Sequence, residues 1–424
     1  MTAPAPSHRK PARAYTNILK LRLNKALRRE VITNYPVIAY IEPTLFCSLR
    51  CPACPTGQKL NLRPAALIDE ALFHSAIDEL GDYLFQLHMY NWGEPLLHKQ
   101  TPELISYARS KNIRVLLSTH FSIPLSDDYL ERLVLSGLDE LTVSLDGTSQ
   151  ETYERYRKGG DLALVRGNMK RLQEHKKRLQ SATPHVSWQF LAFRHNEHEI
   201  ETARTEYREW GAESIAILPP FMSDDPAADG LEPSTDPRFN LDTALRSGAR
   251  KSLARTRPCS WLYGAVVLNP NAKVSPCCAS PDEKDDFGEY SPALGFRAVW
   301  NGVRYRRARS LRPQGGPADD EAAGAAIQRI SGAAVRTSGA LEPDALICQT
   351  CPMVWWQDMV ENAIERIAYA HASRFLKKRQ FRDFAALLLM GLPPLAMVGR
   401  RVLAAFRKRP VPGGTIRKVE GREQ

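Results

Sequence analysis

The sequence lacks the marks of a membrane-spanning or secreted protein. Its apolar run at 384–398 is shorter than the ~20 residues of a spanning helix, and Gly391 and a Pro-Pro pair interrupt it. Residues 1–29 carry many Lys and Arg residues and have no apolar core of a signal peptide. We therefore expect a cytoplasmic protein.

Signatures of nucleic-acid binding are also missing. The formal net charge is +11, but no zinc-finger, helix-turn-helix or RNA-binding motif accompanies it. Much of the basic charge falls in the two ends of the chain and at 304–312. Nucleic acid is therefore disfavoured as a partner.

Cysteine is scarce, and its few positions are informative. Eight cysteines in 424 residues without a secretory signal disfavour a disulfide framework and indicate a reducing compartment. With 43% hydrophobic side chains, a chain of this length can bury a large core and is expected to form more than one domain.

Three of the cysteines form a compact motif. Three residues separate Cys47 from Cys51, and two separate Cys51 from Cys54. A loop with this spacing can place three thiolates around three irons of a 4Fe–4S cubane, which leaves one iron with an open coordination position. The alternatives are a zinc site, a redox pair and chance. Zinc normally takes four ligands, and the nearest histidine, His74, lies twenty residues beyond Cys54.

Strand-like and helical segments alternate around and after this motif. The expected strands are 37–41, 83–91, 113–118, 140–145, 185–193 and 214–218. The helices expected between them include 69–80, 101–111, 127–136 and 164–179, and an amphipathic helix at 16–29 precedes the first strand. This order predicts βα units and a parallel sheet.

Polar residues follow several of these strands. The tripeptide Gly93-Glu94-Pro95 follows the second strand, and Ser144 and Asp146 share one face of the fourth by strand alternation. Such short motifs are individually common at loop ends and turns. Their succession after consecutive strands indicates a ligand site at one edge of the sheet.

The cysteine spacing and these motifs together resemble the radical S-adenosylmethionine (SAM) family. The resemblance implies a partial (βα)6 barrel, a 4Fe–4S cluster on Cys47, Cys51 and Cys54, and SAM chelated to the open iron. The reduced cluster would cleave SAM to a 5′-deoxyadenosyl radical, which abstracts a substrate hydrogen. A flavodoxin- or ferredoxin-type reductant would supply the electron.

The resemblance also implies roles for the strand-end residues. Gly93, Glu94 and Pro95 match the motif that receives the SAM amino group. Ser144 and Asp146 match the pair that contacts the ribose and methionine portions, and Arg157 matches an arginine close to the SAM carboxylate. Two positions depart from the family: Ala53 replaces a common aromatic residue near adenine, and His120 replaces the usual asparagine after the third strand. No general acid or base can be assigned, although His88 and Tyr90 share a strand face that would line the barrel.

The remaining cysteines suggest a second metal site. Four spaced thiolates of this kind suit zinc or a second iron–sulfur cluster. With its surrounding motifs, the segment resembles the auxiliary-cluster extension of radical SAM enzymes, called SPASM with two clusters and twitch with one. The count implies one auxiliary 4Fe–4S cluster, whose expected ligands are Cys259, Cys277, Cys348 and Cys351. Whether Cys277 or Cys278 is the ligand stays open, with Cys277 preferred because it directly follows a proline.

These observations predict four parts of an α/β protein. They are a basic helical extension at 1–36, the partial barrel at 37–245, a small α+β SPASM/twitch-like domain at 255–356 and a basic helical tail at 357–424. An Ala/Gly-rich stretch at 311–346 is expected to be a flexible insertion. Apolar residues between basic clusters in the tail fit a peripheral anchor on the inner, anionic face of a membrane, and a helical hairpin packed on protein is the alternative.

The resemblance leaves the substrate open. One hypothesis is oxidation or epimerisation of a carbohydrate, cyclitol or lipid-linked sugar, which would suit a membrane-facing tail. The alternative is maturation of a ribosomal peptide or a protein side chain, by a crosslink or an oxidation. We expect the sugar, because the four-cysteine arrangement resembles that of an aminocyclitol dehydrogenase. Only ~36 residues precede the first strand, fewer than a compact peptide-binding domain needs, which disfavours the peptide unless a separate protein recognises it. A non-catalytic iron–sulfur scaffold is a remote third interpretation.

Overall fold

The computed structural model describes residues 10–60, 62–220, 230–240, 258–311, 348 and 360–367. The chain divides into two compact units, Met1–Ile364 and Glu365–Gln424. The sheet and the helices that cover it belong to the first unit. Most of the expected insertion and of the tail, as well as Cys351, lie outside the described residues.

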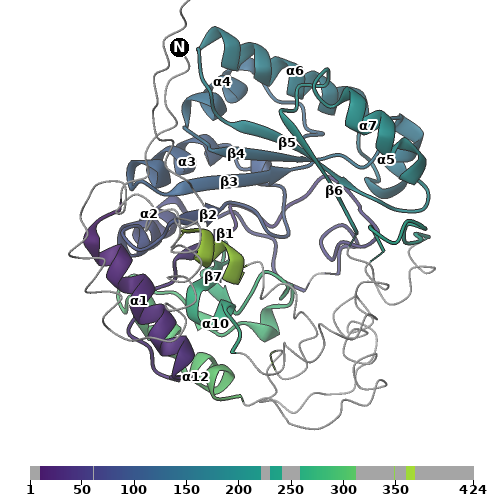
Figure 1. The fold of residues 1–424 in the computed structure, drawn as a ribbon. Coiled ribbons are helices and arrows are strands. Elements are labelled where there is room, and N and C mark those ends of the chain that lie inside the picture. The colour runs from purple at the N-terminus through teal and green to yellow at the C-terminus, as the bar shows by residue number, and fades with distance from the viewer. Residues whose placement is uncertain are drawn as a thin grey trace, which may run out of the picture. The chain divides into compact units, whose positions relative to one another are not determined.

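A parallel sheet of six strands forms the centre of the first unit (Figure 1). Each strand pairs with the next one along the chain, in the order β6-β5-β4-β3-β2-β1. The strands are β1 (Ile38–Ile41), β2 (Gln86–His88), β3 (Arg114–Thr119), β4 (Glu140–Ser144), β5 (His185–Leu191) and β6 (Ser214–Leu218). Parallel pairing of consecutive strands through helical crossovers confirms the predicted α/β partial barrel.

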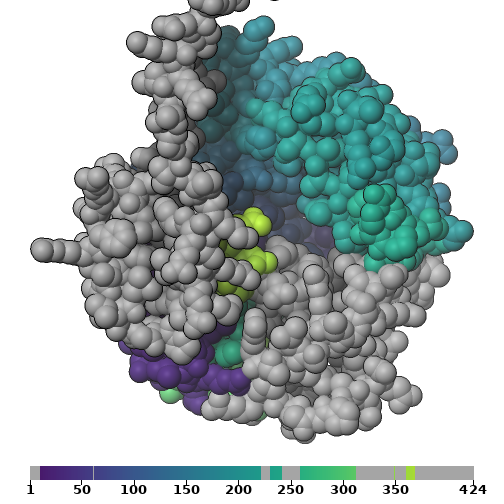
Figure 2. Space-filling view, in the orientation of Figure 1, coloured from purple at the N-terminus to yellow at the C-terminus, as the bar shows by residue number. Residues whose placement is uncertain are grey.

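Helices cover one face of this sheet (Figure 1), and the later ones form a teal surface in the space-filling view (Figure 2). They are α2 (Glu70–Leu80), α3 (Thr101–Ser110), α4 (Asp127–Leu135), α5 (Gln150–Tyr156), α6 (Leu162–Arg178) and α7 (Ile200–Glu206), with short 3₁₀ turns η1 (Pro95–Leu97) and η2 (Glu197–Glu199). Side-chain caps fix several helix starts. Asp161, for example, accepts from Leu164 N at 3.0 Å, which begins α6 two residues earlier than expected.

The first helix differs slightly from the prediction for 16–29. Helix α1 (Ala12–Ala26) begins after Pro11, whose fixed φ suits a helix start, and ends before Arg28, whose φ is +49°. The Asn17 side chain donates to Tyr35 O at 2.9 Å and accepts from Tyr35 N at 2.8 Å. These two bonds fasten α1 to the segment that enters β1.

The second strand is much shorter than the predicted 83–91. Tyr83 N and Leu84 N both donate to Leu80 O, at 2.8 and 3.0 Å, so these residues close the end of α2 instead of extending the sheet. Apolar side chains serve either purpose, and the sequence pattern alone does not separate them.

The segment that carries the auxiliary cysteines continues the same sheet. Strand β7 pairs parallel with β1, so that Tyr40 lies opposite Val267, and two antiparallel strands follow it. The elements are α10 (Trp261–Gly264), β7 (Ala265–Leu268), β8 (Lys273–Ser275), η3 (Glu283–Asp285), β9 (Gly288–Glu289), α11 (Phe296–Trp300) and α12 (Val303–Ser310). The barrel and this segment therefore share strand β1 as a common edge.

Residues 360–367 are helical. Within the part of the chain that the structure describes, no helix is both long and apolar enough to span a membrane. The predicted membrane contact of the tail lies outside the described residues and stays a prediction.

Candidate active site

The loop that follows β1 brings the three motif cysteines together. Cys47, Cys51 and Cys54 all belong to or pack against one small apolar cluster. Its other buried members are Leu49, Tyr156, Phe193 and Leu231. A Cβ atom at Gly57 would lie 2.6 Å from the backbone N and O of Cys51, so the loop closes tightly on itself and requires glycine there.

The three side chains are free thiols whose environment suits a bound metal centre. Burial raises the pKa of Cys47 to about 12, and the charges of Glu94, Cys51 and Cys54 act in the same direction. Burial also raises the pKa of Cys51, against the opposing charge of Arg157. Such thiols stay protonated at neutral pH until a metal replaces the protons. Three neighbouring thiols, of which Cys51 is buried and the other two are half-buried, fit the three-thiolate set of a 4Fe–4S cluster.

A single metal ion would need a tighter arrangement. Among the described residues, no three His, Cys, Asp or Glu side chains converge closely enough to hold one ion. A cubane does not require that convergence, because each thiolate binds a different iron.

The Gly93-Glu94-Pro95 motif packs directly on the entry to the cysteine loop. Glu94 N donates to Phe46 O at 2.8 Å, and a Cβ atom at Gly93 would lie 1.8 Å from Thr44 O. Only glycine permits this approach. The fully buried carboxylate of Glu42 accepts from the backbone N–H groups of Trp92 and Gly93. The motif is therefore held in place from β1.

The Glu94 carboxylate is buried and already bonded within the protein. Oε1 accepts from Thr119 Oγ1 at 2.7 Å and from Leu96 N at 3.1 Å, and Oε2 accepts from His120 N at 2.9 Å. His120 Nε2 lies 3.3 Å from Glu94 Oε2 and 3.3 Å from Ser48 Oγ. The histidine that departs from the family pattern thus links the motif to the cysteine loop. The expected contact of Glu94 with the SAM amino group stays a prediction.

Asp146 and Arg157 form a buried ion pair beside the cysteines. Arg157 Nε donates to Asp146 Oδ2 at 2.6 Å, and Leu191 N donates to Oδ1 at 2.7 Å. Arg157 Nη1 lies 3.9 Å from Cys51 Sγ, and its guanidinium stacks on Tyr156 with 4.9 Å to the ring centroid. Burial alone would lower the pKa of Arg157, but the charges of Asp146 and Cys51 raise it. Arg157 is therefore a permanent cation next to a cysteine ligand.

The remaining predicted residues lie at the same edge of the sheet. Ser144 ends β4 on the face that also carries Asp146, with its Oγ 3.4 Å from Ser118 Oγ of the neighbouring strand. Pro95 begins the 3₁₀ turn η1 and is buried. The structure therefore gathers the predicted strand-end residues around the cysteine loop.

An aromatic cluster on the sheet face opposite the helices lies between the barrel and the auxiliary segment. Tyr40 stacks on His88 with ring centroids 4.2 Å apart and lies 5.3 Å from the Trp261 ring. Tyr90 Oη is 3.1 Å from His88 Nδ1. Burial lowers the pKa of His88 to about 3, so the ring is neutral at physiological pH. The cluster therefore connects strands β1 and β2 with α10 through ring contacts.

Three of the four expected auxiliary ligands lie in the described residues. The Cys259 thiol accepts from the backbone N–H groups of Trp261 and Leu262, and burial raises its pKa. The charges of Cys348 and Cys277 both raise the pKa of Tyr305, so these two cysteines lie near the same side chain. The charge of Cys278 instead raises the pKa of Tyr90 in the barrel, and Cys278 is 9% exposed.

Comparisons with known proteins agree with this geometry. The sequence model of the radical SAM superfamily matches residues 41–203. A PqqA peptide cyclase of Gluconobacter oxydans (strain 621H) is 26% identical over 291 residues, which are 63% of this chain and 76% of that protein. Another PqqA peptide cyclase, from Xanthomonas oryzae pv. oryzae (strain MAFF 311018), is 23% identical over 383 residues, 83% of this chain and 97% of that protein.

A solved structure shows the same fold. Streptococcus suis SuiB bound to the precursor peptide SuiA superimposes with a TM-score of 0.53 and 13% identity, over 80% of each chain. The chain therefore carries a radical SAM domain at residues 41–203, as the sequence predicted, and this supports a radical SAM enzyme. Such a domain implies a SAM-binding 4Fe–4S cluster and SAM itself.

Proposed function

We propose that this radical SAM enzyme modifies a ribosomally made peptide or a protein side chain, by forming a crosslink or by oxidation. The extent of the likeness to PqqA peptide cyclases carries the proposal. It spans 383 residues and 97% of the Xanthomonas oryzae protein, whereas the superfamily match alone covers residues 41–203. The likeness thus extends beyond the part that all such enzymes share. The carbohydrate hypothesis has less support, because no comparable observation favours it.

We assign the cofactor contacts to the residues that the structure gathers. Cys47, Cys51 and Cys54 would hold the SAM-binding cluster, which, when bound and reduced, supplies the electron that cleaves SAM. The residues assigned to SAM are Gly93, Glu94, Pro95, Ser144, Asp146 and Arg157. Arg157 holds positive charge beside Cys51, and the neighbouring apolar cluster excludes water from the cysteine loop.

We assign a second 4Fe–4S cluster to Cys259, Cys277, Cys348 and Cys351. The nearness of Cys277 and Cys348 to Tyr305 supports Cys277 over Cys278 as the ligand. Cys278 fits the role of a small buried side chain.

The overall reaction balances with SAM as the net oxidant, because the one electron taken from the reductant is returned to an oxidised iron–sulfur cluster or to the oxidised reductant. The substrate C–H bond gives its hydrogen atom to the 5′-deoxyadenosyl group, which leaves as 5′-deoxyadenosine. Closing a crosslink or completing an oxidation then releases one more electron and one proton from the substrate. A flavodoxin- or ferredoxin-type protein stays the proposed reductant for SAM cleavage.

The test needs a candidate peptide, which a short reading frame beside the gene would provide. The anaerobic enzyme is incubated with that peptide, SAM and dithionite, and mass spectrometry follows the peptide. We expect a product lighter by two hydrogens, formed together with 5′-deoxyadenosine. The same assay with sugar nucleotides is the control. Turnover of a sugar nucleotide, with the neighbouring peptide unchanged, would overturn the proposal in favour of the carbohydrate hypothesis.

A further inference from the structure

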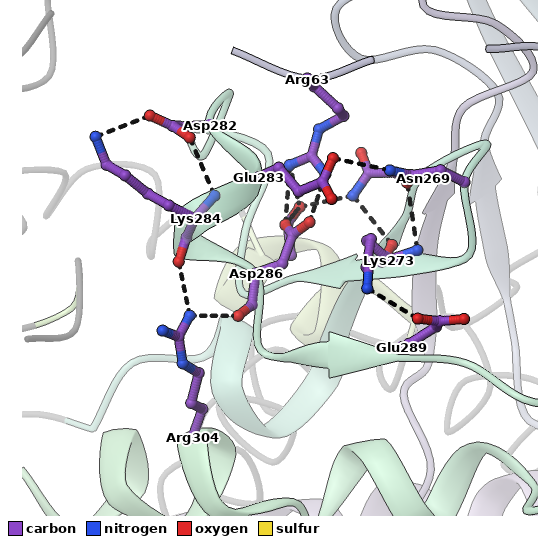
Figure 3. A network of polar contacts seen from close by, with 11 residues as sticks. Arg63, Asn269, Lys273, Asp282, Glu283, Lys284, Asp286, Glu289 and Arg304 are labelled. Carbon is purple, nitrogen blue, oxygen red and sulfur yellow. Dashed lines mark hydrogen bonds and ion pairs between the residues drawn. The ribbon is translucent and has the colours of Figure 1, made fainter. Parts of the chain in front are cut away.

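A buried ion pair connects the segment after the cysteine loop with the auxiliary segment (Figure 3). Arg63 and Asp286 are each 3% exposed at the side chain, and they meet through both guanidinium Nη atoms. Arg63 Nη2 lies 2.9 Å from Asp286 Oδ1 and 3.3 Å from Ser275 Oγ. Ser275, two residues before Cys277, also donates to Asp286 Oδ1 at 2.6 Å.

Backbone contacts extend this connection to the end of β1. Glu283 N donates to Leu62 O at 3.0 Å, and the Asn269 side chain donates to Ser275 Oγ at 2.8 Å. Glu42 N donates at 3.1 Å to the carbonyl oxygen of Leu268, the residue directly before Asn269. The network in Figure 3 therefore adjoins the strand end that carries Glu42.

Glu42 is the group that needs a nearby cation. Its Oε1 accepts from Trp92 N and Gly93 N, while its buried Oε2 has no hydrogen-bond partner among the described residues. Burial raises the pKa of Glu42 to about 7, and the backbone N–H groups of Trp92 and Gly93 and the charge of Arg63 oppose that rise. The Arg63 Nε atom is likewise buried without a partner in the described residues. A buried carboxylate without a compensating charge is costly.

We propose that Arg63 is a positioning residue that connects the auxiliary segment to the SAM-binding motif. Its guanidinium is anchored by Asp286 on the auxiliary side and stabilises the charge of Glu42, whose carboxylate fixes the Trp92–Gly93 peptide in front of Glu94. The inference rests on the proposed contact of Gly93 and Glu94 with SAM, and it is independent of the peptide substrate.

The test measures SAM affinity by equilibrium dialysis on the reconstituted holoenzyme, together with iron content and the thermal unfolding midpoint. Arg63→Met is expected to weaken SAM binding about tenfold, a size typical of coupled buried groups, with full iron content. Asp286→Asn is expected to lower the unfolding midpoint but to leave SAM affinity near the wild-type value, because Arg63 keeps its charge beside Glu42. Lys273→Met, at the exposed Lys273–Glu289 pair of the same network, is the matched control and should change neither quantity.

The double variant Arg63→Met/Asp286→Asn separates positioning from a merely structural role. We expect it to regain part of the thermal stability that the single variants lose, because neither member of the Arg63–Asp286 pair is left as an unpaired charge, while SAM affinity stays as low as in Arg63→Met. Adding Arg63→Met to Glu42→Gln should weaken SAM binding no further, because no carboxylate charge is left to stabilise. Recovery of SAM affinity in the double variant, or wild-type affinity in Arg63→Met, would overturn the inference. Failure of the wild-type enzyme to bind SAM would instead refute the proposed SAM site.

Discussion

An anaerobically reconstituted Cys51→Ala variant is expected to release no 5′-deoxyadenosine from SAM under reducing conditions. Cys51 is the middle cysteine of the motif, lies in the apolar cluster beneath the loop and is the thiol closest to Arg157. With only two thiolates left, a cubane loses one of its three protein ligands, and SAM has no open iron to bind. Iron content should fall by about four per chain, because the auxiliary cysteines are untouched.

Cys278→Ala is the matched control, because this cysteine is also buried, but its charge raises the pKa of Tyr90 in the barrel. It is expected to keep the iron content and SAM cleavage of the wild type. Unchanged iron content in Cys51→Ala would contradict the assignment of the motif. A loss of about four irons in Cys278→Ala would move the auxiliary ligand from Cys277 to Cys278.

Replacing Asp146 by alanine should destabilise the protein strongly. The change leaves the Arg157 guanidinium without its buried partner and Leu191 N without an acceptor. Removing one partner of a buried ion pair typically costs about 3–5 kcal/mol of the free energy of unfolding. Denaturant unfolding of the anaerobic protein, followed by circular dichroism, measures this loss.

Asp127→Ala is the corresponding surface control. Asp127 pairs with Arg171 and His175 but is 73% exposed, so its loss should change stability little. Asp146→Asn separates charge from hydrogen bonding, because asparagine still accepts from Leu191 N. If Asp146→Ala unfolds at the same denaturant concentration as Asp127→Ala, the Asp146–Arg157 pair does not contribute the stability expected of a buried ion pair.

The sequence predicts the parallel core because strand-like and helical segments alternate regularly along it. The strand β6 was expected at 214–218 and is found there, and alternating buried residues place β3 and β5 within one or two residues of the expected bounds. The strand β2 was predicted too long, because Tyr83 and Leu84 close α2 with side chains that would suit a strand equally well. Strands β8 and β9 are too short to show an alternation of apolar and polar residues. Strand β7 pairs with β1, which is far away in the sequence.

Prediction of the candidate site is limited in the same way, by partners that are far apart in the sequence. Motif spacing identifies Cys47, Cys51 and Cys54 because they are close in the chain. Glu42 and Arg63 carry no such signal, because their roles depend on partners elsewhere: Arg63 meets Asp286 across 223 positions of sequence. A charged residue at a strand end, such as Glu42, is ordinarily expected to face solvent. Only the fold shows that its carboxylate is buried against Trp92 and Gly93.

The comparisons favour the substrate class that the sequence had placed second, and the reason is related. The short segment before β1 favoured a sugar over a peptide, but segment length says nothing about the surface that recognises a substrate. The similarity to PqqA peptide cyclases is a better guide, because it extends along most of the chain.

Reductive cleavage of SAM by the wild-type protein tests the central claim most directly. The reconstituted enzyme is reduced with dithionite in the absence of substrate, and SAM, methionine and 5′-deoxyadenosine are quantified over time by liquid chromatography. We expect slow release of methionine and 5′-deoxyadenosine in equal amounts, dependent on reductant. SAM that stays intact while spectroscopy shows a fully loaded and reduced cluster would contradict it.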